Sequence, residues 1–135
     1  MEPQPLHLQA PVYEAMIEHA RQVAPLECCG LLGGTELRAQ RYYPLRNELA
    51  SPVRYQGDAR DMLAAFRDLR ENGLELVAIY HSHPSSPAVP SRTDLQNNFY
   101  EDTPQLILSL AEGPPVLRAY RLSENDYTEL AWQLD

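Results

Sequence analysis

The chain from residue 74 to residue 84 reads Leu-Glu-Leu-Val-Ala-Ile-Tyr-His-Ser-His-Pro. Its first seven residues are nearly all apolar, which is typical of a central strand that is covered on both faces. The strand runs directly into His81 and His83, and side chains two positions apart on a strand project to the same side. This stretch therefore predicts a rigid buried strand that ends in a pair of histidines facing one way.

Ser91 and Asp94 follow these histidines after a loop that contains three prolines, counting those at both of its ends. Two imidazoles and one carboxylate are ligands that zinc prefers, and a set of three protein ligands leaves one position open, as in catalytic sites. We therefore expect His81, His83 and Asp94 to bind one zinc ion per chain. Taken alone, Ser91 and Asp94 also fit a helix capping box, and both interpretations can hold together.

Glu27 is the candidate for moving protons beside this metal. It stands next to Cys28, Cys29 and apolar residues at the start of a buried strand, where an acid without a task is unusual. A carboxylate there can take a proton from the attacking water and later give it to the leaving amine. Ser91 can donate its hydroxyl to the oxygen that becomes negative. Seen alone, Glu27 also fits an exposed acid at a strand end.

Two helices are predicted from apolar stripes at helical spacing. The first covers residues 11–23, where Pro11 suits the first turn. The second starts near Asp58, a good N-cap, and ends at Asn72-Gly73. Its expected buried face consists of Met62, Phe66 and Leu69, with Leu63 alongside.

Strands are predicted on either side of these helices. Residues 27–34 read as a buried strand that ends in a tight turn at a glycine pair. The other expected elements are a partner strand at 37–45, a possible short strand at 53–55, a short helix within 91–99, and strands at 105–110, 116–121 and 127–134. The order β-α-β-β-α-β followed by a β-rich end predicts an α/β fold in one domain, residues 1–135, with helices packed on a mixed sheet.

Charge and composition exclude several classes of protein. Nineteen acidic residues against eleven basic ones give a net charge of −8, which argues against binding to nucleic acid. The first residues contain neither a basic region nor an apolar run, and no stretch approaches the ~20 apolar residues of a membrane span. We therefore expect a soluble cytoplasmic protein. Cys28 and Cys29 are neighbours that cannot form an unstrained disulfide, so we expect them to be small core residues.

The motifs resemble one family when they are read together. Glu27-Cys28-Cys29-Gly30, then His81-Ser82-His83-Pro84, seven residues, and Ser91-Arg92-Thr93-Asp94 resemble the JAMM motif of the MPN domain in type, order and spacing. The stretch 45–47 before Ser51-Pro52 also resembles the intervening pattern of this family. The likeness covers nearly the whole chain.

This resemblance implies a cytidine-deaminase-like α/β sandwich and a zinc peptidase or isopeptidase. In the family the two histidines and the aspartate bind the metal, which here implies His81, His83 and Asp94. Glu27 is then the acid and base, and Ser91 stabilises the oxyanion. Short prokaryotic members imply cleavage after the Gly-Gly end of a ubiquitin-like sulfur-carrier protein, which releases a C-terminal cysteine or extension.

Three alternatives remain at this point. The first is an isopeptidase or general peptidase with another protein substrate. The second is a non-catalytic MPN scaffold that only binds partners. The third is a thiol hydrolase that uses Cys28 or Cys29, although this acidic chain offers no electropositive surroundings for a thiolate.

Overall fold

The computed structural model describes residues 4–97 and 102–135. Its elements in chain order are β1 (Leu6–Leu8), α1 (Ala10–Val23), β2 (Cys29–Thr35), β3 (Arg38–Leu45), α2 (Ala59–Glu71), β4 (Glu75–His83), α3 (Arg92–Gln96), β5 (Gln105–Ser109), β6 (Val116–Leu122), β7 (Tyr127–Leu130) and β8 (Trp132–Leu134). The predicted mixed α/β fold is confirmed, and both long helices lie where the sequence predicts them.

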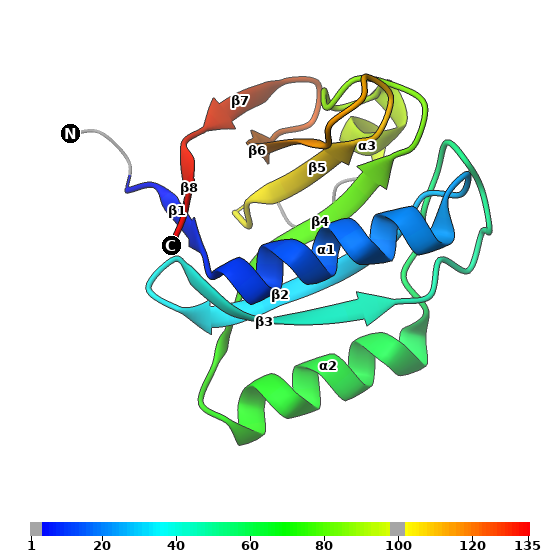
Figure 1. Ribbon diagram of the computed structural model, residues 1–135. Helices are drawn as coiled ribbons and strands as arrows, with labels where there is room; N and C mark the ends of the chain where they lie inside the picture. Colours follow the sequence, from blue (N-terminus) through cyan, green and yellow to red (C-terminus); the bar gives the residue numbers. More distant parts are fainter. Residues whose placement is uncertain (1–3, 98–101) are drawn as a thin grey trace.

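One eight-stranded mixed sheet forms the centre of the molecule, in the order β7-β6-β5-β4-β2-β3-β1-β8 (Figure 1). β4 pairs with β2 antiparallel and with β5 parallel, so it is an inner strand. Its residues from Val77 to His83 are all buried, as the apolar run predicts. The end of β4 is therefore buried and lies between two neighbouring strands.

The two long helices cover opposite faces of the sheet. Val12, Met16 and Ala20 of α1 belong to one core cluster, which includes Tyr80 of β4. Ala65 of α2 belongs to a second cluster on the other face, with Ile79 of β4. Alternate residues of β4 thus point to alternate helices, as the pleat of a strand requires. None of the described helices is long and apolar enough to cross a membrane.

The sheet curls strongly because its two edges are joined by a single residue. β7 and β8 lie at opposite edges, yet only Ala131 separates them in the chain. In a flat sheet of eight strands these edges would be roughly 34 Å apart, at ~4.8 Å per strand, and one residue spans only ~3.5 Å. The carbonyl of Ala131 also accepts a hydrogen bond from the N–H of Leu6 on β1. The prediction of one continuous strand over residues 127–134 was therefore wrong.

The glycine pair lies inside β2 rather than in a turn. The register shifts between Gly33 and Gly34, and the strand continues to Thr35. A Cβ atom on Gly34 would lie 1.8 Å from the carbonyl oxygen of Arg38, so this bulge requires glycine. The turn follows at Glu36 and Leu37, which both adopt positive φ.

Smaller differences concern surface segments. On α2, Leu69 is buried and Met62 is partly buried, as predicted, but Leu63 and Phe66 are exposed and Ala65 lies on the buried face. Residues 53–55 form no strand. The helix expected within residues 91–99 extends from Arg92 to Gln96, and Phe99 lies outside the described residues.

Candidate active site

His81 and His83 stand at the carboxyl end of β4, on the same face of the sheet. Both side chains are almost fully buried, and the two Nε2 atoms are 3.1 Å apart. Ser82 between them points to the opposite face, where its Oγ accepts a hydrogen bond of 2.8 Å from the N–H of Cys28. The strand pleat thus presents two imidazoles together, as predicted.

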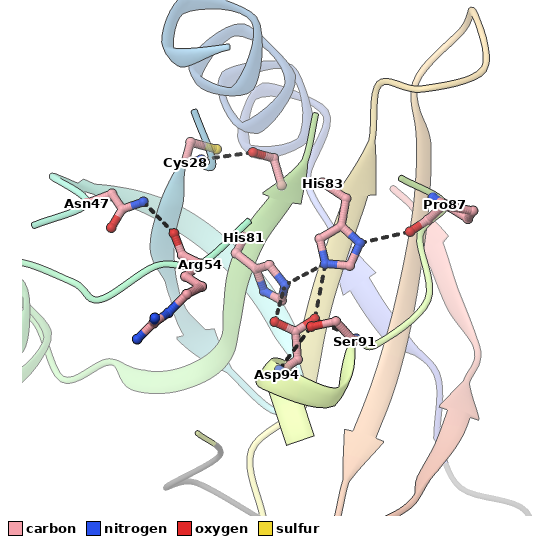
Figure 2. A network of polar contacts seen from close by, with 9 residues as sticks. Cys28, Asn47, Arg54, His81, His83, Pro87, Ser91 and Asp94 are labelled. Carbon is pink, nitrogen blue, oxygen red and sulfur yellow. Dashed lines mark hydrogen bonds and ion pairs between the residues drawn. The ribbon is translucent and has the colours of Figure 1, made fainter. Parts of the chain in front are cut away.

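Asp94 reaches the histidines from the first turn of α3. Its Oδ1 lies 3.2 Å from Nε2 of His81, and its Oδ2 lies 3.0 Å from Nε2 of His83 (Figure 2). Ser91 caps the helix: its Oγ accepts from the N–H of Asp94 at 3.0 Å, and Oδ2 of Asp94 accepts from the N–H of Ser91 at 2.9 Å. The predicted capping box is present, and it holds the carboxylate against both histidines.

These three side chains suit a cation. Nδ1 of His83 lies 2.8 Å from the carbonyl oxygen of Pro87, which can only accept, so this nitrogen carries a hydrogen. In the neutral ring Nε2 is then a lone-pair donor, and it faces a carboxylate oxygen and a second imidazole nitrogen. One ligand atom from each of His81, His83 and Asp94 lies within 4.8 Å of the others. Such converging electron-pair donors favour a positive charge between them, and this donor set is one that zinc accepts.

Electrostatics inside the cluster favour an ionised Asp94. Burial alone would raise the pKa of Asp94, but its contacts with His81 and His83 and the hydrogen bond from the N–H of Ser91 hold it well below its usual range. Burial lowers the pKa of His83, yet the contacts with Asp94 and with the Pro87 carbonyl outweigh burial and raise it. The carboxylate of Asp94 therefore stays negatively charged although it is buried.

Glu27 lies two residues before the start of β2 and is 3% exposed. Burial raises its pKa to about 8; His83 opposes this shift and Asp94 reinforces it. Its Oε1 has no hydrogen-bond partner within residues 4–97 and 102–135. The expected buried acid is thus present, and the interpretation of Glu27 as an exposed strand end is wrong.

Two residues at the site were not singled out from the sequence. The ring of Tyr55 stacks on that of His81, with centroids 4.6 Å apart and planes inclined by 22°. The side-chain amide of Asn47 donates to the carbonyl oxygens of Glu27, at 3.1 Å, and of Arg54, at 2.9 Å. The one signal for Asn47 in the sequence was the family resemblance over residues 45–47. Tyr55 belonged to the short strand expected at 53–55, which does not form.

The two cysteines and the other two histidines do not belong to the cluster of His81, His83 and Asp94. Cys28 and Cys29 are 1% exposed, as expected of core residues. Burial raises the pKa of both thiols, that of Cys29 to about 12, which disfavours the thiolate that a thiol hydrolase needs. His7 pairs with Asp135 and His19 contacts the hydroxyl of Tyr42.

A cavity of about 590 Å³ lies beside the cluster. Its lining includes Asp94 itself, Tyr55 over the site, and the apolar side chains of Leu31, Met62 and Ile79. A partly apolar cavity thus adjoins the cluster at Asp94, which is the usual form of a substrate site.

The sequence and the fold match known proteins over most of the chain. Residues 9–123 match the family described as prokaryotic homologs of the JAB domain. The CysO-cysteine peptidase of Mycobacterium tuberculosis is 35% identical over 127 residues, which cover 92% of this chain and 87% of that protein. A probable TtuB-protein conjugate cleaving protease of Thermus thermophilus is 34% identical over 126 residues, which cover 93% of this chain and 81% of that protein.

A solved structure gives the same result for the fold. The solution structure of a protein from Desulfitobacterium hafniense superimposes with a TM-score of 0.88 at 37% identity, covering 96% of this chain and 92% of that chain. The curled sheet with a helix on each face is therefore shared along nearly the whole length.

Proposed function

Because this chain belongs to the family of prokaryotic JAB-domain proteins, we propose that it is a zinc-dependent peptidase. It cleaves the amide bond after the C-terminal Gly-Gly of a ubiquitin-like sulfur-carrier protein and removes a cysteine or a short extension. The observation that supports this most is the convergence of His81, His83 and Asp94 near a buried, protonatable Glu27.

The metal ligands in this proposal are Nε2 of His81, Nε2 of His83 and a carboxylate oxygen of Asp94. Zinc supplies Lewis-acid polarisation of the scissile carbonyl and makes water easier to deprotonate. The protein holds its ligands from two rigid places, the end of β4 and the capped first turn of α3. Such support keeps a ligand set in its productive geometry.

Glu27 moves the proton. Burial raises its pKa to about 8, so near neutral pH the carboxylate and the carboxylic acid are both accessible forms. It takes a proton from the attacking water and gives it to the amine that leaves. The buried position also prevents bulk water from competing for this proton.

Ser91 stabilises the developing oxyanion. Its Oγ already accepts the N–H of Asp94, so the hydroxyl hydrogen is left to donate elsewhere. Because the cap fixes the hydroxyl next to Asp94, this donor is in place before the substrate arrives. One such donor is worth roughly 3–4 kcal/mol in the transition state.

The substrate class follows from the relatives and from the cavity. One relative is named for CysO-cysteine and another for TtuB-protein conjugates. In this proposal the substrate tail passes closely beside the metal ligands in an extended form, which only residues without side chains would allow, and this would account for a demand for glycine.

The test uses a sulfur carrier that ends in Gly-Gly-Cys and a matched carrier that ends in Ala-Ala-Cys. Mass spectrometry should show that the zinc-loaded protein removes cysteine from the first carrier and leaves the second intact. If the protein cleaved unrelated peptides and left both carriers intact, the assigned substrate would be wrong. Only the assignment as a peptidase would then remain.

A second candidate is an isopeptidase that releases carriers from other proteins, since the Thermus relative is named for cleaving conjugates. A carrier joined through its Gly-Gly carboxyl to a lysine side chain separates the two activities. Faster release from lysine than from cysteine would favour the isopeptidase. A scaffold without catalysis would bind less than one zinc per chain and cleave neither.

A further inference from the structure

The two metal-ligating histidines are held in different ways. Nδ1 of His83 is fixed by the carbonyl of Pro87 at 2.8 Å. Nδ1 of His81 is buried and has no hydrogen-bond partner in the part of the chain that the structure describes. Histidine ligands normally donate this second N–H to a fixed acceptor, which sets the plane of the ring. Asp94 and His83 contact Nε2 of His81, but no hydrogen bond from the described residues holds the other side of this ring.

Tyr55 supplies the missing constraint. Its ring lies nearly parallel to that of His81, with centroids 4.6 Å apart. Tyr55 comes from the loop of residues 46–58, which connects β3 to α2 and contains no helix or strand. An aromatic ring on a loop can orient another ring only if the loop itself is held.

Asn47 holds this loop closed. Its Oδ1 accepts from the N–H groups of Leu49 and Gln56, both at 3.1 Å, and its Nδ2 donates to the carbonyl of Arg54 at 2.9 Å. Figure 2 shows the last of these contacts beside the histidines. Arg54 and Gln56 flank Tyr55, so one amide fixes the backbone on both sides of the stacking ring.

The same amide also reaches Glu27. Nδ2 of Asn47 donates to the carbonyl of Glu27 at 3.1 Å, and the N–H of Glu27 donates to the carbonyl of Ser51 in the same loop at 2.8 Å. Both backbone polar groups of Glu27 are thus bonded to this loop. The amide of Asn47 uses all four of its hydrogen-bonding positions, which no other side chain of this size offers.

We propose that Asn47 is a positioning residue that joins the proton-moving Glu27 to the loop that presses Tyr55 against His81. One side chain then sets the distance between the proton carrier and the metal ligands. The inference rests on the proposed function for its kinetic consequence, but the orientation of His81 can be measured without any substrate.

The main variant is Asn47→Asp, which keeps the acceptor for Leu49 and Gln56 and loses both donors. Asn47→Ala removes all four bonds. The matched control is Asn72→Ala: Asn72 also donates its amide to a carbonyl, that of Asp68 at 2.8 Å, but does so at the end of α2. Both Asn47 variants should lower kcat by ~10–100-fold with KM changed less than about twofold, as for other groups that orient metal ligands. Asn72→Ala should leave kcat unchanged.

A second readout does not depend on activity. Cobalt replaces zinc, and the visible absorption spectrum of the cobalt protein reports the geometry of its ligands. Asn47→Asp and Tyr55→Leu should each change this spectrum, whereas Asn72→Ala should not. In the double variant that combines Asn47→Asp with Tyr55→Leu, kcat should fall no further than in the less active of the two single variants. Both substitutions disrupt the same link between the loop and His81, so their effects should not add.

Several results would contradict the positioning role of Asn47. An unchanged cobalt spectrum in both variants, or additive losses in the double variant, would overturn the positioning role. Failure of both Asn47 variants to fold would also overturn it in favour of a purely structural loop closure. A wild-type protein that cleaves no carrier would contradict the proposed function alone, because the spectra still test the orientation of His81.

Discussion

Glu27 is a carboxyl group whose chemistry depends on burial. Replacement by glutamine keeps its size and removes its ability to exchange a proton. We expect Glu27→Gln to keep one zinc per chain while kcat falls by ~10²–10⁴, the usual contribution of a positioned general base. Glu75→Gln, an exposed acid at the start of β4, is the matched control and should retain full activity. Near-normal turnover by Glu27→Gln would make the assigned role untenable.

The raised pKa of Glu27 also predicts how stability depends on pH. The ordinary pKa of this carboxyl is 4.5, and burial raises it to about 8. Between these two pH values the folded chain keeps a proton on Glu27 that the unfolded chain has lost. The free energy of unfolding must therefore decrease as pH rises through this window, by a few kcal/mol at about 1.36 kcal/mol per pKa unit.

Urea unfolding of chelator-treated protein between pH 5 and pH 8 measures this dependence. In Glu27→Gln, the free energy of unfolding should decrease less steeply with rising pH than in the wild type. A smaller decrease should remain, because the pKa of His83 is raised as well and acts in the same direction. Identical slopes for wild type and Glu27→Gln would contradict a buried, protonated Glu27.

The histidines give a prediction on metal affinity. His83→Ala removes a ligand, so zinc affinity should fall by more than the roughly 10–100-fold that the hydrogen-bond partners of ligands contribute. His7→Ala removes a histidine that only pairs with Asp135 and should bind zinc normally. Calorimetric titration compares the two, and equal affinities would remove His83 from the ligand set.

The sequence predicted the candidate residues better than it predicted their supports. His81, His83 and Asp94 lie together because strand alternation and a helix cap are local rules that a sequence displays. The stacking of Tyr55 and the carbonyl of Pro87 depend on loop paths, which no periodicity encodes. The catalytic role of Glu27 stays a prediction that the kinetics above will test.

At the scale of elements, α3 combines a structural cap with a proposed catalytic donor in Ser91. The two roles can be separated, because glycine replaces serine as an N-cap at a cost of only a few tenths of a kcal/mol. Ser91→Gly should therefore unfold almost as wild type does, while kcat falls by ~10²–10³ through loss of the hydroxyl. Ser91→Thr keeps the hydroxyl and the cap and serves as the control.

Chemical denaturation and steady-state kinetics of these variants measure the two effects independently. A parallel loss of stability and activity in Ser91→Gly would show that Ser91 acts only as a cap. Full activity of this variant would exclude the oxyanion role.

Elements were predictable where the local pattern was unambiguous. α2 begins after Asp58 and ends at Asn72, as predicted, because helix capping is a local property of the sequence. The glycine pair at 33–34 indicated a turn, but tertiary crowding against Arg38 accounts for Gly34 within the strand. Leu69 is buried on α2 as its apolar stripe predicted, whereas Leu63 and Phe66 fitted the same stripe and are exposed.

At the scale of the whole molecule, the parallel pairing of two inner strands brings the site together. β4 and β5 pair in parallel, so the chain must cross over between them, and this crossover contains α3 with Ser91 and Asp94. The resemblance implied this class of fold, but the alternation over residues 127–134 gave no sign of the break at Ala131. Closure of a sheet depends on strands that are distant in the chain, and local alternation does not record it.

The most direct measurement is a titration of zinc into chelator-stripped protein with a Gly-Gly-Cys carrier present. Cleavage should be absent without metal, should rise in proportion to added zinc, and should stop rising at one equivalent per chain. Undiminished cleavage in excess chelator, or one tightly bound zinc with the carrier left uncut, would contradict the account.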